Sequence, residues 1–175
     1  RIAIFMSGTD PDGTTMLALS ALSQDDLATV PLDIAIGSGS PHCAAIREAA
    51  KSHPRAAMHV DLPDLADLFA AADLSIGSGG VAALERCCVG LPTVTLTLAA
   101  NQEPALAELS RLGAVKHLGN SGRKGLATAQ IRAVIARATY TADEQRLVHF
   151  CDVLRSGVPA DEQDHVILAL RDFLT

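Results

Sequence analysis

Short apolar runs alternate with segments of helical periodicity over roughly the first 120 residues of the chain. The apolar runs lack regular polar alternation, which is typical of strands in a parallel sheet buried on both faces. The pattern predicts strands at 2–6, 32–36, 57–60, 74–76, 93–98 and 115–117. It predicts helices at 14–22, 41–52, 63–72, 80–89 and 102–112. In the third helix, one face carries Leu62, Leu65, Leu68, Phe69 and Ala72.

Proline and glycine positions agree with these boundaries. Pro41 and Pro63 lie where the first turn of a helix tolerates proline, and Gly90 and Gly113 lie just past helix ends. Strand–helix units joined by right-handed crossovers build a doubly wound α/β domain. We therefore predict a Rossmann-like fold with a parallel sheet.

The pattern changes after about residue 120. The stretch "GNSGRKG" is typical of a polar loop, and helical patterns follow at 126–138, 142–154 and 161–174. We expect 1–120 to form the Rossmann-like domain and 121–175 to form a helical extension packed on it. Because Arg1 leads directly into an apolar strand, we also expect that a preceding segment is missing.

Composition narrows the class of protein. Apolar residues make up 49% of the chain and charged residues 19%, which is typical of a soluble globular protein. The net charge of -6 disfavours a nucleic-acid partner, since phosphate binding needs clustered Lys and Arg. No apolar run approaches the roughly 20 residues of a membrane span, and no secretory signal opens the chain. We therefore expect a cytoplasmic protein.

The cysteines give no sign of a metal site. Cys43, Cys87, Cys88 and Cys151 show neither CxxC nor Cys/His spacing for zinc. Cys87 and Cys88 are adjacent on a predicted helix, which favours small core residues in a reducing compartment. We expect no metal and no cofactor.

Four unusual turns follow predicted strands, at the edge where open α/β sheets bind ligands. They are "SGTDPDG" (7–13), "GSGSPH" (37–42), "GSGG" (77–80) and "AANQE" (99–103). Glycines let backbone N–H groups approach an anion, and the following helix adds the positive end of its dipole. The turns fit neither GxGxxG with an acid at the ribose spacing nor the P-loop pattern. They predict a phosphate-bearing ligand, unless the glycines serve only to make tight turns.

Glu85 follows the last glycine of the third of these turns by five residues. At about 1.5 Å per residue it lies roughly 7 to 8 Å along the helix from Gly80. This is about the separation of a diphosphate from its ribose hydroxyls, for which a carboxylate is a suitable acceptor. The alternative is a solvated Glu85 paired with Arg86 or Arg111.

A hydrolytic enzyme needs a base, and His42 is the one histidine predicted at the ligand edge. Its alternative role is capping or packing in a βα turn. No acid is spaced to orient the other histidines, which are His53, His59, His117, His149 and His165. We therefore expect no complete catalytic constellation in this chain.

The stretch "IGSGGVAALERCCVGLPTVTLTLAANQ" (76–102) resembles the UDP-2,4-diacetamido-2,4,6-trideoxy-β-L-altropyranose hydrolases of pseudaminic acid biosynthesis. It is also similar to the related spore-coat polysaccharide biosynthesis proteins. More distantly, Ser78, Gly79 and Glu85 resemble the UDP-binding motif of the lipid II-forming peptidoglycan glycosyltransferase. The resemblance runs from Arg1 to about residue 120. It implies the C-terminal, nucleotide-binding half of a GT-B fold, whose absent N-terminal domain would carry the catalytic histidine.

The resemblance also implies roles for individual residues. The glycine pair would hold the diphosphate, Glu85 the ribose and backbone near Val60 the uracil, while the first turn would close over the diphosphate. Asn101 and Gln102 would face the sugar or its leaving phosphate. The implied UDP-binding residues are Ser7, Gly8, Thr9, Asp10, Val60, Ser78, Gly79, Gly80 and Glu85. The chain departs from the family pattern at Val81, Ala82 and Leu84, where hydroxyl residues and Trp are common.

Residues and resemblance together predict half of a UDP-sugar hydrolase that acts on a UDP-linked deoxy-amino sugar. The pathway would be surface polysaccharide or nonulosonic acid biosynthesis, and the partners would be the UDP-sugar or UDP and the absent domain. Alternatives are a UDP-sugar-dependent glycosyltransferase of GT-B fold, a non-catalytic nucleotide-sugar binding module and, less favoured, a flavodoxin-like regulatory domain. We expect the isolated chain to be inactive.

Overall fold

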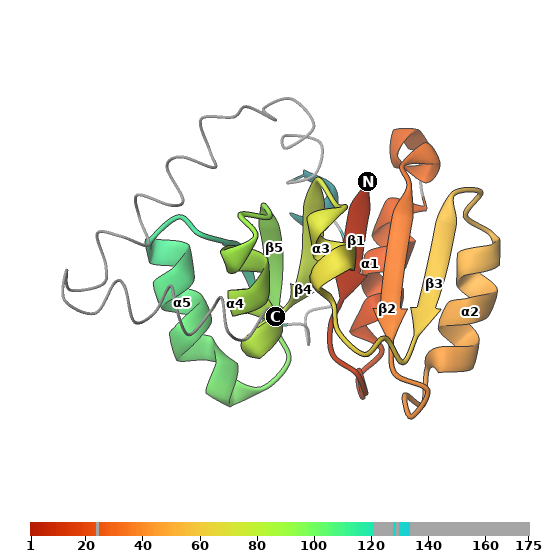
Figure 1. Ribbon diagram of the computed structural model, residues 1–175. Helices are drawn as coiled ribbons and strands as arrows, with labels where there is room; N and C mark the ends of the chain where they lie inside the picture. Colours follow the sequence, from red (N-terminus) through yellow and green to blue (C-terminus); the bar gives the residue numbers. More distant parts are fainter. Residues whose placement is uncertain (24, 121–127, 129, 134–175) are drawn as a thin grey trace.

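The computed structural model of the chain describes residues 1–23, 25–120, 128 and 130–133 (Figure 1). The strands are β1 (Ile2–Phe5), β2 (Leu32–Ile36), β3 (Ala56–Val60), β4 (Leu74–Ser78), β5 (Thr93–Thr97) and β6 (Lys116–Asn120). The α-helices are α1 (Thr14–Leu22), α2 (Cys43–Lys51), α3 (Ala66–Ala70), α4 (Val81–Cys88) and α5 (Glu103–Arg111). Two short 3-10 helices are η1 (Asp25–Thr29) and η2 (Ala100–Gln102).

The six strands form one sheet in the order β3-β2-β1-β4-β5-β6, and every neighbouring pair is parallel. In the register of the central strands, Ile4 lies opposite both Ile34 and Ile76. The strand order reverses between β1 and β4. This topology confirms the predicted doubly wound fold, and the reversal marks the crevice where such sheets bind ligands.

Helices cover both faces of the sheet, as Figure 1 shows. Side chains of β1 alternate between two cores, because successive residues of a strand point to opposite faces. Ile2 and Ile4 join the larger core with residues of α1 and α2, whereas Ala3 joins a smaller core with Phe69 of α3. The strands β1, β2, β4 and β5 are almost entirely buried, as the apolar runs predicted.

Several element boundaries differ from the sequence prediction, and the differences at α3 and β4 are described here because β4 leads into the glycine turn. The third helix, expected over 63–72, spans only Ala66–Ala70, and the Asp64 carboxylate accepts the N–H of its first residue. Strand β4, expected to stop at residue 76, continues through Gly77 and Ser78, which pair with β5. The first half of the "GSGG" turn is therefore strand, and only Gly79 and Gly80 make the turn.

Most of the predicted helical extension, including the stretches at 142–154 and 161–174, lies outside the described residues. Residues 128 and 130–133 are helical, and Ile131 is fully buried in the larger core. Helices in the described part of the chain lack the length and apolar character that crossing a bilayer requires.

Candidate functional site

The turn between β4 and α4 lies at the point where the strand order reverses. Gly79 is buried, whereas Gly80 is exposed and adopts a positive φ of 85°. A side chain at position 80 would be strained, since only glycine adopts this backbone conformation readily. Gly80 immediately precedes the first helical residue of α4, so the exposed end of this turn is also a helix N-terminus.

Gln102 packs against this glycine turn. A Cβ built on Gly79 would lie 2.9 Å from the Gln102 Cβ, so the two segments touch only because residue 79 has no side chain. The Gln102 Oε1 accepts the N–H of Leu98 at 3.0 Å, which fixes the side chain beside the turn. Asn101 is exposed on η2. The structure thus brings the glycine pair and the "NQ" segment together at one edge.

The turn after β1 divides into a buried and an exposed part. Asp10 is fully buried, and its carboxylate accepts the N–H groups of Thr14 and Thr15, each at 2.9 Å. This carboxylate occupies the N-terminus of α1, where an anion would otherwise bind. Gly8 and Thr9 are exposed and form the part of the turn that a ligand can reach.

Ser7 supports the same turn from below, because its Oγ accepts the N–H of Asp10 at 2.7 Å. The carbonyl of Gly8 accepts the N–H of Gly37 at 2.8 Å, which ties the turn after β1 to the turn after β2. Glycine is needed at position 37, since a Cβ there would lie 2.5 Å from the Gly8 carbonyl oxygen.

His42 adds a second tie between these two turns. Its Nε2 lies 2.9 Å from the carbonyl oxygen of Pro11, and a Cβ on Gly13 would lie 3.3 Å from its ring. In the structure this ring therefore packs in a βα turn, which is the alternative that the sequence left open.

Val60 ends β3 at the same edge, and Asp61 follows it with a positive φ of 54°. The Asp61 carboxylate accepts the N–H of Ser38 at 2.8 Å. Hydrogen bonding by the side chain and backbone of Ser38 lowers the pKa of Asp61 below its ordinary value. The ends of β2 and β3 are thus joined beside the position predicted to meet the uracil.

Glu85 is half-buried on α4, and no hydrogen bond or ion pair within the described residues holds its carboxylate. The structure shows no direct ion pair to either partner that the sequence offered as an alternative. Arg111 binds Glu108 through two hydrogen bonds at 2.6 and 2.8 Å, and Arg86 is 0% exposed rather than solvated. The Glu85 carboxylate therefore makes no direct ion pair with either guanidinium, although its charge acts on Arg86 through space.

Arg86 is the residue that the sequence analysis missed. Its Nη2 donates to the carbonyl oxygen of Ser78 at 2.5 Å, directly before the glycine pair. Burial lowers the pKa of Arg86 to about 10, which leaves it protonated at pH 7. The hydroxyl of Ser78 donates inward to the carbonyl of Met6, so this side chain also points into the fold. A basic residue sharing the buried helix face with Ala83 and Cys87 was the available signal.

The neighbouring cysteines follow the prediction in part. Cys87 is buried, and burial raises the pKa of its thiol to about 11, as expected for an inert core residue. Cys88 is half-buried, and its pKa is also raised, chiefly by burial. Cys43 is a half-buried free thiol, and Cys151 lies outside the described residues.

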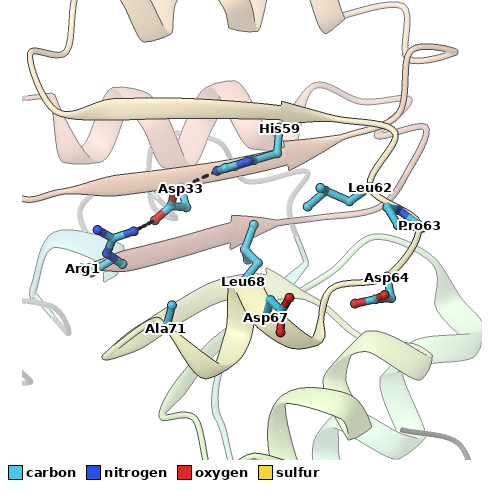
Figure 2. Close-up of a pocket in the computed structure, with 9 residues that line it drawn as sticks. All are labelled: Arg1, Asp33, His59, Leu62, Pro63, Asp64, Asp67, Leu68 and Ala71. Carbon is cyan, nitrogen blue, oxygen red and sulfur yellow. Dashed lines mark hydrogen bonds and ion pairs between the residues drawn. The ribbon is translucent and has the colours of Figure 1, made fainter. Parts of the chain in front are cut away.

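Two histidines that were expected to lack an orienting acid have one in the structure. The Nε2 of His59 lies 2.8 Å from Asp33 Oδ1, and Arg1 Nη1 donates to Asp33 Oδ2 at 2.8 Å. Figure 2 shows the linked side chains of His59, Asp33 and Arg1 along one wall of a cavity between the sheet and α3. The cavity has a volume of about 280 Å³. The cavity is lined by none of the predicted site residues, so it is separate from the glycine turns.

The second histidine is His117, whose ring nitrogens lie 3.2 Å from the hydroxyls of Thr95 and Thr97. Its Nε2 is 3.7 Å from Glu103 Oε1, and Thr97 Oγ1 donates to Glu103 Oε2 at 2.7 Å. The expectation that no acid orients this ring is wrong. Thr97 and His117 therefore connect Glu103, the first residue of α5, to strands β5 and β6.

This fold and edge define a Rossmann-like domain of the kind found in GT-B glycosyltransferases. No known family model matches the chain. The spore coat polysaccharide biosynthesis protein SpsG of Bacillus subtilis (strain 168) is 29% identical over 120 residues. The match covers 68% of this chain and 35% of SpsG, so the chain spans about a third of that protein.

Solved structures agree on the fold. The spinosyn rhamnosyltransferase SpnG, complexed with spinosyn aglycone, matches with a TM-score of 0.69 at 20% identity, over 89% of this chain and 42% of SpnG. The C-terminal CMP-Kdo binding domain of WaaA from Acinetobacter baumannii matches with a TM-score of 0.56 at 15% identity. That match covers 89% of this chain and 89% of the WaaA domain, so the two share a fold over most of their lengths.

Proposed function

We propose that this chain is the nucleotide-sugar-binding half of a GT-B enzyme of polysaccharide biosynthesis and that it binds a UDP-linked sugar. One observation carries the proposal. The exposed Gly80 immediately precedes α4 at the reversal of strand order, and α4 carries Glu85, a carboxylate that makes no direct ion pair. The likeness to SpsG supports the pathway class, and the CMP-Kdo binding domain of WaaA supports a nucleotide-sugar ligand.

The roles follow from the chemistry of each group. Backbone N–H groups of Gly79 and Gly80, with the dipole of α4, bind the diphosphate. Glu85 accepts hydrogen bonds from the ribose hydroxyls, and the backbone at Val60 meets the uracil. Gly8 and Thr9 cover the diphosphate from the β1 side. Asn101 offers both a donor and an acceptor to the sugar.

The proposed reaction of the whole enzyme is hydrolysis of the UDP-sugar. Water attacks the anomeric carbon, the bond from that carbon to the phosphate oxygen breaks, and the electron pair leaves with UDP. A base in the other half of the enzyme takes the proton of the water. Donors at the β4–α4 turn stabilise the negative charge that develops on the departing diphosphate.

The test separates hydrolysis from transfer. The longer protein that contains this chain is incubated with a UDP-sugar, and UDP release is measured with and without a candidate acceptor. Hydrolysis predicts release in water alone and an equal amount of free sugar. Release that requires the acceptor would show a glycosyltransferase instead, and binding without release under both conditions would show a non-catalytic module.

The chain by itself is expected to bind UDP and to release none from a UDP-sugar. Measurable turnover by purified 1–175 would contradict the division of labour between the two halves.

A further inference from the structure

Arg86 is a cation buried directly behind the proposed anion site. It is 0% exposed, and its Nη2 donates to the carbonyl oxygen of Ser78. Its Nε and Nη1 have no hydrogen-bond partner within the described residues. The guanidinium also lies 5.5 Å from the centre of the Phe69 ring, which offers a weak cation–π contact in place of a carboxylate.

The fold makes room for this cation. A Cβ on Gly77 would overlap Arg86 Nη1 and would lie 2.6 Å from the carbonyl oxygen of Phe5. The glycine inside β4 is therefore needed for the guanidinium rather than for an anion. Burial of a charge without a direct ion pair is costly, so the position of Arg86 calls for a compensating function.

The peptide that Arg86 contacts is also the first peptide of the glycine turn. Its carbonyl belongs to Ser78 and its N–H to Gly79, and in a trans peptide these two groups point in opposite directions. A hydrogen bond from a cation to the carbonyl oxygen polarises the whole peptide group and strengthens its N–H as a hydrogen-bond donor. Arg86 thus fixes the orientation of the Ser78–Gly79 peptide.

We propose that Arg86 is a positioning residue that supplies the buried positive charge for an anion bound at the Gly79–Gly80 turn. The proposal rests on the proposed function, since it concerns the diphosphate of the same nucleotide. Arg86 contacts no ligand and acts through the Ser78–Gly79 peptide and through its own field. That field is weakly screened, because the guanidinium is buried.

The experiment compares UDP with uridine, which lacks the phosphates, by titration of the 175-residue chain followed by NMR. Arg86→Gln keeps an amide donor but removes the charge, and it should weaken UDP binding about tenfold. This is the size expected for one charge acting across roughly 10 Å at an effective dielectric constant near 20. Uridine affinity should stay unchanged.

Two further variants separate charge from shape. Arg86→Lys keeps the charge and should bind UDP within about threefold of the wild type. Arg111→Gln is the matched control, because it removes an exposed guanidinium that is paired only with Glu108, and it should bind like the wild type. If Arg86→Gln binds UDP as tightly as the wild type, or loses UDP and uridine equally, the proposal is wrong.

A measurement on the wild type covers the case in which Arg86→Gln does not fold. UDP should shift the Arg86 Nε–H resonance of the wild-type chain, whereas uridine should leave it in place. An unmoved resonance at saturating UDP would overturn the proposal while leaving the proposed function intact. Absence of any UDP binding by the wild type would contradict the proposed function itself, and this inference would fall with it.

Discussion

Asp10 offers the sharpest test of how the β1 turn is built. Its buried carboxylate accepts the N–H groups of Thr14 and Thr15, so Asp10→Ala leaves two donors of α1 without a partner. Hydrogen bonds to a charged group contribute about 1.5–3 kcal/mol each, whereas measured cap substitutions cost about 0.5–2 kcal/mol in total. Both threonines are nearly inaccessible to replacement water, so we expect an intermediate loss of about 2–4 kcal/mol.

The assay is urea unfolding of the chain followed by far-UV circular dichroism. Asp10→Asn keeps one acceptor and tolerates the positive φ of 38° at this position, so it should lose about half as much stability. In thermal melts, about 2–4 °C are expected per kcal/mol for a chain of this size. Asp12→Asn, in the exposed part of the same turn, is the matched control and should unfold like the wild type.

The structure also predicts what these variants leave unchanged. The Asp10 carboxylate is committed to α1, so Asp10→Asn should bind UDP within about threefold of the wild type. Two results would refute the reasoning: stability equal to that of Asp12→Asn, or a loss of UDP binding without a loss of stability.

Three other perturbations test the edge of the sheet. Gly80→Val should abolish UDP binding, because its positive φ disfavours a branched side chain at the helix entrance; unchanged affinity by calorimetry would place the diphosphate elsewhere. Asn101→Ala in the whole enzyme should lower turnover more than UDP affinity, and the reverse pattern would remove its role at the sugar. Because Ser38 lowers the pKa of Asp61, the folded state binds a proton less readily there than the unfolded state. That stabilisation is present above about pH 4 and is lost as the pH falls through the pKa of Asp61 in the folded state. Asp61→Asn should therefore lose less stability on acidification than the wild type does. If the stability of both proteins falls in parallel with pH, Asp61 makes no such contribution.

Periodicity was sufficient for the fold because the four central strands, β2, β1, β4 and β5, are buried on both faces. The runs around Ile4, Ile34 and Ile76 carry no competing polar pattern, and the structure places these three residues in adjacent strands. The boundaries of α3 were harder to predict, since the apolar face over 62–72 is longer than the five-residue helix that forms.

The role of the first glycine in "GSGG" could not be predicted from its neighbours in the sequence. Gly77 looked like part of an anion-binding loop, but it lies within β4 and leaves space for Arg86, nine residues later on a packed helix. Its role depends on the way α4 folds back over β4. The burial of Arg86 depends on the same packing of α4 over β4 and could not be predicted from local sequence. The sequence analysis therefore offered Arg86 as a partner of a solvated Glu85.

The contacts between these histidines and carboxylates could not be predicted from the sequence, because the paired residues are distant along the chain. Asp33 reaches His59 across the β2–β3 pair, and Glu103 reaches His117 from the start of α5. Sheet register and helix docking bring these groups together, and neither is encoded in local spacing. A polar residue inside an otherwise apolar strand, such as Asp33, is the local signal that could have prompted a search for a partner.

The central claim is that the β4–α4 turn and Glu85 hold a uridine diphosphate, and one calorimetric comparison tests it directly. UDP and 2′-deoxy-UDP are titrated into the wild type, into Glu85→Ala and into the control Glu108→Ala. The Glu108 carboxylate lies on α5 and pairs with Arg111 of the same helix. We predict that the wild type and the control prefer UDP by about tenfold, which is about 1.4 kcal/mol, and that Glu85→Ala binds both ligands equally. A wild type that binds neither ligand, or a Glu85→Ala variant that still prefers UDP, would contradict the account.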